Sequence, residues 1–366
     1  MVLTEREREI VALLRRDPLL SPAALASRLG TTRAAVNVHL SNLGKKGVIL
    51  GRGYVLSEQP GVVVIGGANM DVKARSSAAI VSATSNPGSG SMAPGGVGRN
   101  IAENLARLGD RVHLVAAVGT DPLGDELLTA TASAGVHVEG LRRSAHPTGT
   151  YTAVLDAEGE LVVAVADMAA TDALTPADVD ADVVAAAGLV VLDGNLAAET
   201  LGYVLDVATD AGVRVVIDPV SVPKAARIAP LLLASRPVDV ITPNRDELAA
   251  LTGLPVDSEH EVEKAVTELH GRGVELVWVR LGAAGSLLSG SGERRRLASY
   301  TTDPGEVVDV TGAGDAMLAA FCHALLGGAE PTEAAAYGHA AAAATVASPF
   351  TVRPDLTDRL VRSHLS

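Results

Sequence analysis

Short apolar runs recur along the chain from Val62 onward and alternate with longer stretches of helical periodicity. Runs of four to seven residues that are rich in Val, Ile and Leu predict strands buried on both faces. The six clearest runs are Val62–Ile65, Val112–Val118, Leu189–Leu192, Val213–Ile217, Val238–Ile241 and Leu276–Val279. Strands that alternate with helices predict an α/β domain over residues 61–366, with a doubly wound, mostly parallel sheet.

Two segments interrupt this alternation. Residues 70–93 lack helical periodicity, and residues 149–165 are typical of a hairpin that turns at Glu158 and Gly159. Neither segment fits a strand followed by a crossover helix.

Residues 1–57 have a different pattern, which predicts a winged helix-turn-helix domain. Apolar side chains alternate with charges over residues 4–16, Ser21 precedes a second helical segment, and a third runs over residues 33–43. Residues 47–56 predict a short hairpin, the wing, and residues 57–60 a linker.

The third helix of this domain has a polar stripe at four-residue steps, opposite an apolar face. Its members are Arg33, Asn37, Ser41 and Lys45. Such side chains suit base edges and phosphates in a DNA major groove. Charge supports this prediction: residues 1–60 hold nine Lys or Arg against five Asp or Glu, whereas the remaining chain holds 21 against 38. The alternative is a solvated face on a dimerisation module.

A glycine-rich turn precedes a helix near the C-terminus. Residues 316–326 are good helix formers, Gly327 and Gly328 follow as a stop signal, and Gly312-Ala313-Gly314-Asp315 comes directly before them. Small residues let backbone N–H groups converge on an anion at a helix N-terminus, and Asp315 adds a carboxylate there. The pattern indicates phosphoryl transfer, although Asp315 as a simple helix cap is the alternative.

A second cluster, Pro94-Gly95-Gly96-Val97-Gly98-Arg99-Asn100, precedes a helical stretch that ends at Gly109. Neither cluster is a P-loop, because no Gly-Lys-Ser or Gly-Lys-Thr follows, and neither has the dinucleotide-binding spacing. The two clusters, in this order, resemble the signatures of the ribokinase-like carbohydrate kinases, often called the PfkB family. Gly66–Asp71, Asn244–Glu247 and Leu281–Gly285 match further landmarks of that family.

Within that family, several phrases are similar to pseudouridine kinases. They are Ser85–Gly88, Ala166–Met168, Leu192–Asn195 and Asp218–Lys224. The resemblance implies a ribokinase-like fold in which residues 70–93 and 149–168 form a small β-sheet lid. It also implies a homodimer, since the lid commonly serves in dimer contacts.

The resemblance assigns roles in phosphoryl transfer, with ATP and Mg²⁺. Asp315 is expected to be the general base, and the N–H groups of Gly312, Ala313 and Gly314 are expected to hold the developing charge. ATP-binding residues are expected to be Asn244, Gly282, Gly285 and Thr311. Glu247 would hold Mg²⁺ through water, unless it only caps a helix with Asn244. Asp309 would contact a monovalent cation such as K⁺.

The resemblance also indicates residues for the acceptor. A clamp on vicinal sugar hydroxyls is expected from Asn69, Asp71, Gly95, Gly96 and Asn100. Asn86, Asp167 and Lys224 are candidates for the pseudouracil base, with an ordinary surface-loop position as the alternative for each.

The expected function is ATP-dependent 5′-phosphorylation of pseudouridine. Alternatives are a kinase for ribose, fructose or inosine, or a transcription regulator that senses a nucleoside. The charged N-terminus is unlike a signal peptide and no apolar run approaches about 18 residues, so a cytoplasmic protein with no membrane partner is expected.

Overall fold

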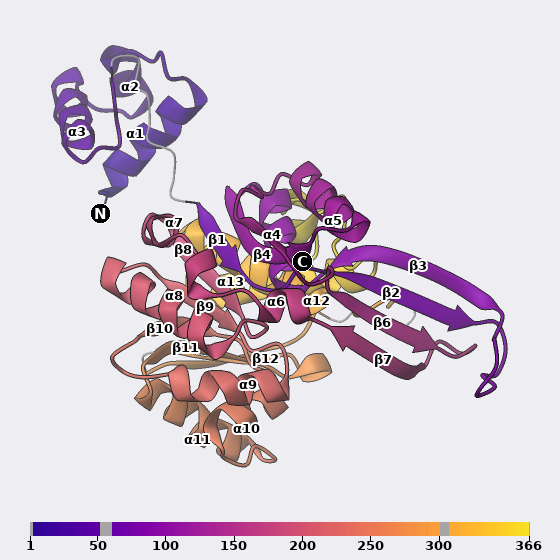
Figure 1. Cartoon of the computed structure of the whole chain (residues 1–366). Coiled ribbons are helices and arrows are strands. Elements are labelled where there is room, and N and C mark those ends of the chain that lie inside the picture. The colour runs from indigo at the N-terminus through magenta and orange to yellow at the C-terminus, as the bar shows by residue number, and fades with distance from the viewer. Residues whose placement is uncertain (1–2, 52–60, 291, 301–306, 366) are drawn as a thin grey trace. The chain divides into compact units, whose positions relative to one another are not determined.

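The computed structural model describes residues 3–51, 61–290, 292–300 and 307–365. The chain divides into two compact units, Met1–Gln59 and Pro60–Ser366 (Figure 1). Within the described ranges, no helix combines the length and hydrophobicity needed to cross a membrane.

The N-terminal unit contains three helices, α1 (Glu5–Arg16), α2 (Pro22–Arg28) and α3 (Arg33–Lys45). Each begins after a hydroxyl side chain that accepts a backbone N–H three residues on, as a good N-cap does. The helices enclose a small core of Ile10, Val11, Leu14, Leu20, Leu25, Ala26, Val36 and Leu43. Half of the predicted wing, residues 52–56, and the linker, residues 57–60, lie outside the described residues.

The second unit is built on a nine-stranded sheet with the order β13-β12-β11-β10-β9-β8-β1-β4-β5. From β5 to β11 all neighbours are parallel, and β12 and β13 add an antiparallel edge. The strands are β1 (Val62–Ile65), β4 (Val112–Gly119), β5 (Leu141–Ser144), β8 (Leu189–Asp193), β9 (Val215–Asp218), β10 (Val238–Ile241), β11 (Val274–Arg280), β12 (Ser286–Ser289) and β13 (Arg294–Leu297). This confirms the predicted doubly wound sheet.

Helices cover both faces of the sheet, as the continuous apolar strands require (Figure 1). One core lies against α7 (Ala181–Ala185), α8 (Ala198–Ala211), α9 (Val222–Ile228), α10 (Arg245–Thr252) and α11 (Glu259–Gly271). The other lies against α4 (Val97–Leu108), α5 (Pro122–Ser133), α12 (Ala313–Leu326) and α13 (Pro331–Val346). Two short helices, α6 (Ala169–Asp172) and α14 (Asp358–Ser363), complete the unit.

One strand begins later than the sequence predicts. The apolar run from Val213 suggested a strand at that residue, but β9 starts at Val215. Gly212 ends α8 in the left-handed region (φ +65°), and the N–H of Val213 returns to the carbonyl of Ala208 at 2.9 Å. The first residues of the run therefore belong to the helix-ending turn.

A separate four-stranded sheet, the lid, projects from the unit (Figure 1). It contains β2 (Asn69–Ser76), β3 (Gly88–Gly95), β6 (Thr150–Leu155) and β7 (Leu161–Asp167), in the order β3-β2-β6-β7. The two segments that interrupt the α/β pattern thus pair with each other. Because β2 starts four residues after β1 ends, the base of the lid adjoins the carboxyl ends of the parallel strands, where ligands bind in such folds.

Candidate active site

The glycine turn before α12 is shaped by close backbone packing. Gly312 has φ +80°, and a Cβ there would collide with the carbonyl oxygen of Thr351. Glycine suits this position because it tolerates the positive φ and because there is no room for a Cβ atom. The helix begins at Ala313, whose N–H donates to the carbonyl of Val310 at 3.3 Å, and Asp315 lies in its first turn beside the N-terminal N–H groups. This is the expected cradle for an anion.

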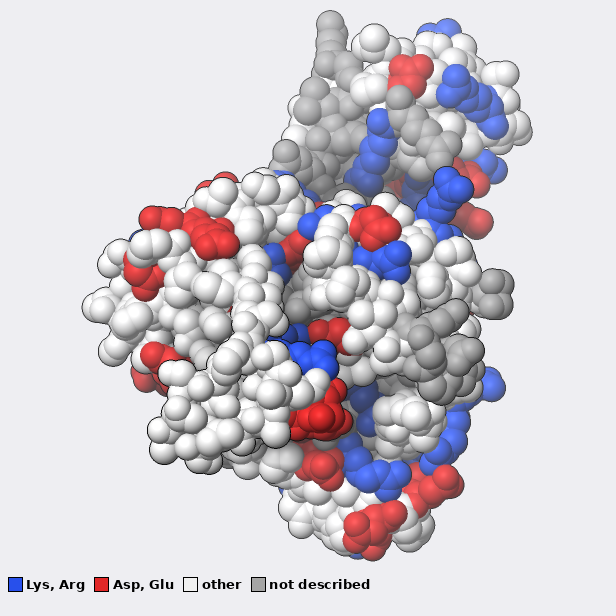
Figure 2. All heavy atoms as spheres, turned by 90° about the vertical axis from the view of Figure 1, so that its right-hand side faces the viewer, with Lys and Arg blue, Asp and Glu red and all other residues white. Residues whose placement is uncertain are grey.

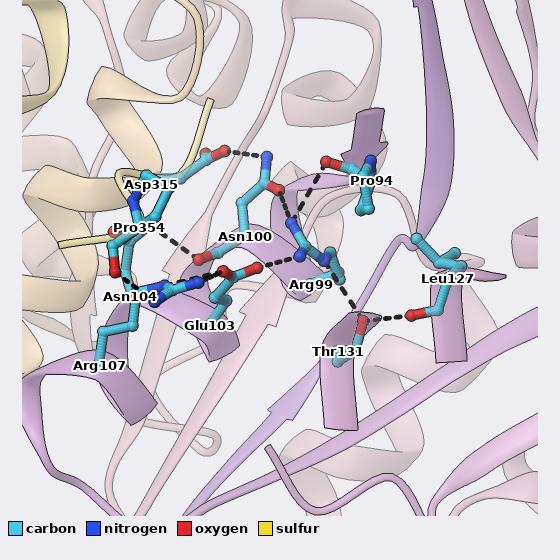
Figure 3. A network of polar contacts seen from close by, with 10 residues as sticks. All are labelled: Pro94, Arg99, Asn100, Glu103, Asn104, Arg107, Leu127, Thr131, Asp315 and Pro354. Carbon is cyan, nitrogen blue, oxygen red and sulfur yellow. Dashed lines mark hydrogen bonds and ion pairs between the residues drawn. The ribbon is translucent and has the colours of Figure 1, made fainter. Parts of the chain in front are cut away.

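The carboxylate of Asp315 is held by the second glycine-rich helix start (Figure 3). Asn100, in the first turn of α4, donates from Nδ2 to Asp315 Oδ2 at 2.8 Å. Gly96 begins that helix with φ +96°, and a Cβ there would lie 2.5 Å from the carbonyl oxygen of Gly67. The two clusters, more than 200 residues apart, thus meet at one hydrogen bond.

Arg99 fixes the orientation of Asn100. Its Nη1 donates to Asn100 Oδ1 at 3.1 Å and to the carbonyl of Pro94 at 3.2 Å, and Nη2 pairs with Glu103 (Figure 3). Because the amide oxygen faces Arg99, the amide NH₂ faces Asp315. Sequence reasoning quoted Arg99 as part of the cluster but gave it no role.

Burial raises the pKa of Asp315 from 3.8 to about 8. The hydrogen bond from Asn100 opposes this shift, the Asp218 carboxylate adds to it, and Arg280 counters it. A carboxyl group that titrates near neutrality is suited to proton transfer at neutral pH.

Asp193, at the end of β8, lies fully buried beneath this site. Its Oδ2 accepts the N–H of Gly67 at 2.8 Å and that of Gly98 at 2.7 Å. A Cβ on Gly66 would collide with this carboxylate. Asp193 therefore joins the loop after β1 to the start of α4. Sequence reasoning missed it, because Leu192–Asn195 was noted only as a family-like phrase.

Arg280, at the end of β11, lies beside the anion cradle. Its Nη1 is 3.0 Å from Asp218 Oδ2, and its Nη2 is 3.3 Å from Glu247 Oε2. A Cβ on Gly314 would lie 2.9 Å from Arg280 Nη1, so the guanidinium abuts the first turn of α12. A fixed positive charge at this position suits a phosphate ligand. Neither Arg280 nor Asp218 was predicted as a site residue.

Glu247 forms the capping box with Asn244 that the sequence suggested. Asn244 Oδ1 accepts the N–H of Glu247, and Glu247 Oε2 accepts the N–H of Asn244, both at 2.8 Å. Burial raises the pKa of Glu247, although Arg280 opposes the shift. A carboxylate already bound to a guanidinium fits Mg²⁺ through water better than by direct coordination.

A cavity of about 430 Å³ adjoins Arg280 and the first turn of α12. Its lining is mainly apolar and includes Gly282, Gly285, Ala283, Val310, Met317 and Ala343. Gly285 has φ +83° in the turn after β11, and a Cβ there would collide with the carbonyl of Leu297. Gly282 and Gly285, both predicted to bind ATP, thus line a cavity next to the cradle. Thr311, also predicted to bind ATP, instead forms hydrogen bonds to Asp309.

Several of the residues predicted to bind the acceptor lie at the base of the lid. Asn69 Nδ2 donates to Asp71 Oδ1 at 2.8 Å, and Gly95 packs against the Asp71 carboxylate. Burial raises the pKa of Asp71, while Asn69 opposes the shift. Asp167, at the end of β7, does not join them: pairing with Thr150 and Met70 puts it on the lid face opposite Asp71, where it is exposed and its Oδ1 accepts the N–H of Ala169 at 3.2 Å.

Lys224, in α9, donates to Asn195 Oδ1, and burial lowers the pKa of this lysine despite the nearby Asp193. Asn195 was quoted only within the phrase Leu192–Asn195, and sequence reasoning gave it no role of its own. Asn195 Nδ2 would lie 3.0 Å from a Cβ on Gly67, which places the pair near the loop after β1.

Two further predicted residues do not join this group as expected. Asn86 lies in the connection between β2 and β3, where it bonds to the backbone of Val81 and Thr84; these contacts match the surface-loop alternative. Asp309, which was expected to contact a monovalent cation, has its Oδ2 2.7 Å from the ammonium of Lys73.

The chain matches two protein families. Residues 59–358 match the pfkB family carbohydrate kinases, and residues 3–49 match a winged helix-turn-helix DNA-binding family. The sugar kinase YeiI of Escherichia coli (strain K12), itself uncharacterized, is 35% identical over 358 residues, 97% of each chain. The pseudouridine kinase of the same organism is 35% identical over 306 residues, 82% of this chain and 95% of that one.

Solved structures agree with this relationship. Arabidopsis thaliana ribokinase complexed with ribose and ATP has a TM-score of 0.72 at 27% identity, covering 84% of this chain and 99% of its own. A carbohydrate kinase from Agrobacterium tumefaciens has a TM-score of 0.71 at 31% identity, covering 83% and 96%. The fold and these matches define an ATP-dependent phosphotransferase that acts on a sugar or nucleoside. The chain belongs to the pfkB family of carbohydrate kinases and carries an N-terminal winged helix-turn-helix unit.

The raised pKa of Asp315 predicts a pH-dependent gain in stability for Asp315→Asn. Between pH ~4 and the folded-state pKa of about 8, Asp315 is protonated in the folded protein but ionised in the unfolded chain. The free energy of unfolding of the wild type therefore falls as the pH rises through this range. Asparagine can still accept from Asn100 but does not titrate. In urea unfolding followed by the fluorescence of Trp278, the advantage of Asp315→Asn should therefore grow from pH 5 to pH 8 and then level off.

Asp210→Asn, on the exposed face of α8, is the matched control and should show no such slope. A constant difference between Asp315→Asn and wild type over this range would mean that Asp315 is ionised throughout in the folded protein.

Proposed function

We propose that this chain transfers the γ-phosphoryl group of ATP to the 5′-hydroxyl of pseudouridine. The observation that carries the proposal is the half-buried Asp315 carboxylate, held by Asn100 at the mouth of α12. The 35% identity to a pseudouridine kinase, over 95% of that protein, supports the choice of acceptor.

In the proposed reaction, Asp315 accepts the proton of the 5′-hydroxyl as that oxygen bonds to the γ-phosphorus. The bond between the γ-phosphorus and the β,γ-bridging oxygen breaks, and ADP leaves. N–H groups of Gly312, Ala313 and Gly314, together with Arg280, stabilise charge on the transferred group. Mg²⁺, held through water by Glu247 near Asn244, would neutralise the phosphates.

The acceptor would bind between the lid and the carboxyl ends of the strands. Asn69 and Asp71 offer a donor and an acceptor for two adjacent sugar hydroxyls, and Gly95 and Gly96 let the backbone pack against the Asp71 carboxylate and Gly67. Lys224 is the proposed contact for the base, because its ammonium can donate to a carbonyl oxygen of the uracil ring. Asp167, on the opposite face of the lid, is not part of this proposed pocket.

A turnover panel tests the acceptor. Pseudouridine should be phosphorylated with a kcat/KM well above that of uridine, inosine, ribose or fructose. Asp315→Asn should lower kcat by about 10²–10⁴-fold, the usual contribution of a general base, while pseudouridine still binds in calorimetry. Phosphorylation of ribose or fructose but not of pseudouridine would contradict the proposed acceptor and leave the proposed reaction type intact. An unchanged kcat for Asp315→Asn would contradict the role of Asp315 as general base.

The N-terminal unit favours a second, regulatory function, DNA binding through α3. Arg33, Asn37, Ser41 and Lys45 are all exposed on α3, while Val36 and Leu43 face the core. This is the arrangement of a recognition helix, and the winged helix-turn-helix match supports it.

DNA binding can be measured with a duplex selected from a random pool. Arg33→Ala should reduce the free-energy preference for the selected duplex over non-specific DNA by about 1–3 kcal/mol. Lys45→Ala should reduce the slope of log affinity against log salt concentration by about 1. Arg8→Ala, on the exposed side of α1, is the control. Equal losses of DNA affinity in all three variants would contradict a role for α3. Repeating the titration in the presence of pseudouridine tests whether the nucleoside regulates DNA binding.

We also propose a homodimer formed through the lid. Cross-strand pairing puts Met92, Val72, Val163 and Val165 on the lid face opposite Asp71 and Lys73. Met92, Val163 and Val165 are exposed, and much of the side from which the lid projects is uncharged (Figure 2). An exposed apolar sheet face suits a second copy of the same face.

In sedimentation velocity the wild type should be a dimer. Val165→Glu should weaken the dimer at least about tenfold, because it would bury a charge without a partner. Val183→Glu, on the exposed side of α7, should leave it intact. A wild-type monomer at micromolar concentration would contradict the proposal.

A further inference from the structure

Lys73 joins the lid to the loop that precedes the anion cradle. Its ammonium lies 2.7 Å from Asp309 Oδ2 and 3.3 Å from Thr311 Oγ1. Lys73 is on β2, and Asp309 and Thr311 come just before Gly312. Asp71, Lys73 and Arg75 share one face of β2, so Lys73 reaches this loop from the strand that also carries the proposed sugar clamp.

Both carboxylate oxygens of Asp309 are engaged. Oδ1 accepts the N–H of Thr311 at 2.8 Å and its hydroxyl at 2.6 Å, while Oδ2 accepts from Lys73. Burial alone would raise the pKa of Asp309, but the bonds from Lys73 and Thr311 outweigh it and hold this pKa below its usual value. The ionised carboxylate thus has a cationic partner within the chain.

The ammonium also borders a cavity of about 290 Å³ beside the cradle. Lid residues line one side, and the loop Pro349–Val352 lines another. The carbonyl of Thr351 in that loop packs directly against Gly312. Lys73 therefore lies where the lid, the cradle turn and this loop meet.

This donor set fits a bound monovalent cation poorly. A cation at Asp309 would need the carboxylate oxygen that Lys73 now contacts, and it would lie beside a like charge. The ammonium of Lys73 thus makes the contact with Asp309 that the family resemblance led us to expect from K⁺.

We propose that Lys73 is a positioning residue that acts as a built-in cation behind the anion cradle. It neutralises Asp309, orders the turn through Thr311 and couples the position of the lid to the geometry of the cradle. Phosphoryl transfer should then need no monovalent cation. The inference rests on the proposed phosphoryl transfer but not on the choice of pseudouridine.

The first measurement compares KCl with tetramethylammonium chloride at equal ionic strength. For wild type, the melting temperature, the ADP affinity by calorimetry and the ATP turnover should be the same in both salts. Lys73→Met should bind ADP about tenfold more weakly without K⁺, as expected for the loss of a charge-assisted contact, and K⁺ should restore part of the affinity and raise the melting temperature.

Two further variants separate this role from a general loss of structure. Arg75→Met, on the same face of β2 but one pleat farther from the cradle, should behave as wild type in both salts. Asp309→Asn combined with Lys73→Met should cost less than the sum of the single changes, because each single change leaves one charge without its partner.

K⁺-dependent ADP binding in wild type, or a Lys73→Met variant that matches wild type in both salts, would overturn the proposal. ADP affinity and melting temperature involve no acceptor, so a failure of pseudouridine turnover leaves both results interpretable. Failure of ADP to bind any variant would instead contradict the kinase function itself.

Discussion

The hydrogen bond between Asn100 and Asp315 is the contact on which the proposed chemistry depends. It joins the first turns of α4 and α12, which pack against each other on one face of the sheet. Arg99 sets the orientation of Asn100, and Glu103 compensates the charge of Arg99, so a chain of buried polar groups fixes one carboxylate. Such networks are stabilising when each member has a partner, and the removal of one member leaves a buried group unsatisfied.

Close backbone packing brings the two helix starts together. Gly66, Gly96, Gly98 and Gly312 each lie where an added Cβ would meet backbone or a buried carboxylate. At Gly96 and Gly312 the positive φ adds a conformational reason. The glycine clusters are thus required by the close backbone approach that buries Asp193 and brings Asp315 to Asn100.

The sequence predicted the fold and the two glycine-rich helix starts well, because these depend on local patterns. Apolar runs gave the strands, and glycine followed by a helical stretch gave the two helix starts. Arg280, Asp193 and Lys73 escaped prediction because their importance comes from partners far along the chain, such as Asp218, Gly67 and Asp309, and no local spacing signals such pairs. Asn86 is an example of a local pattern that misleads. The phrase around it is similar to the family, but its side-chain amide forms hydrogen bonds to the backbone of Val81 in the same turn.

The central claim is that Asp315 meets the acceptor hydroxyl and the terminal phosphate in one crevice. A crystal structure of Asp315→Asn with pseudouridine, Mg²⁺ and a non-hydrolysable ATP analogue tests it most directly. The account predicts the 5′-oxygen within hydrogen-bond distance of the side chain at position 315 and in line with the bond between the γ-phosphorus and its bridging atom. A 5′-oxygen directed away from position 315, or a γ-phosphate bound far from the first turn of α12, would contradict it.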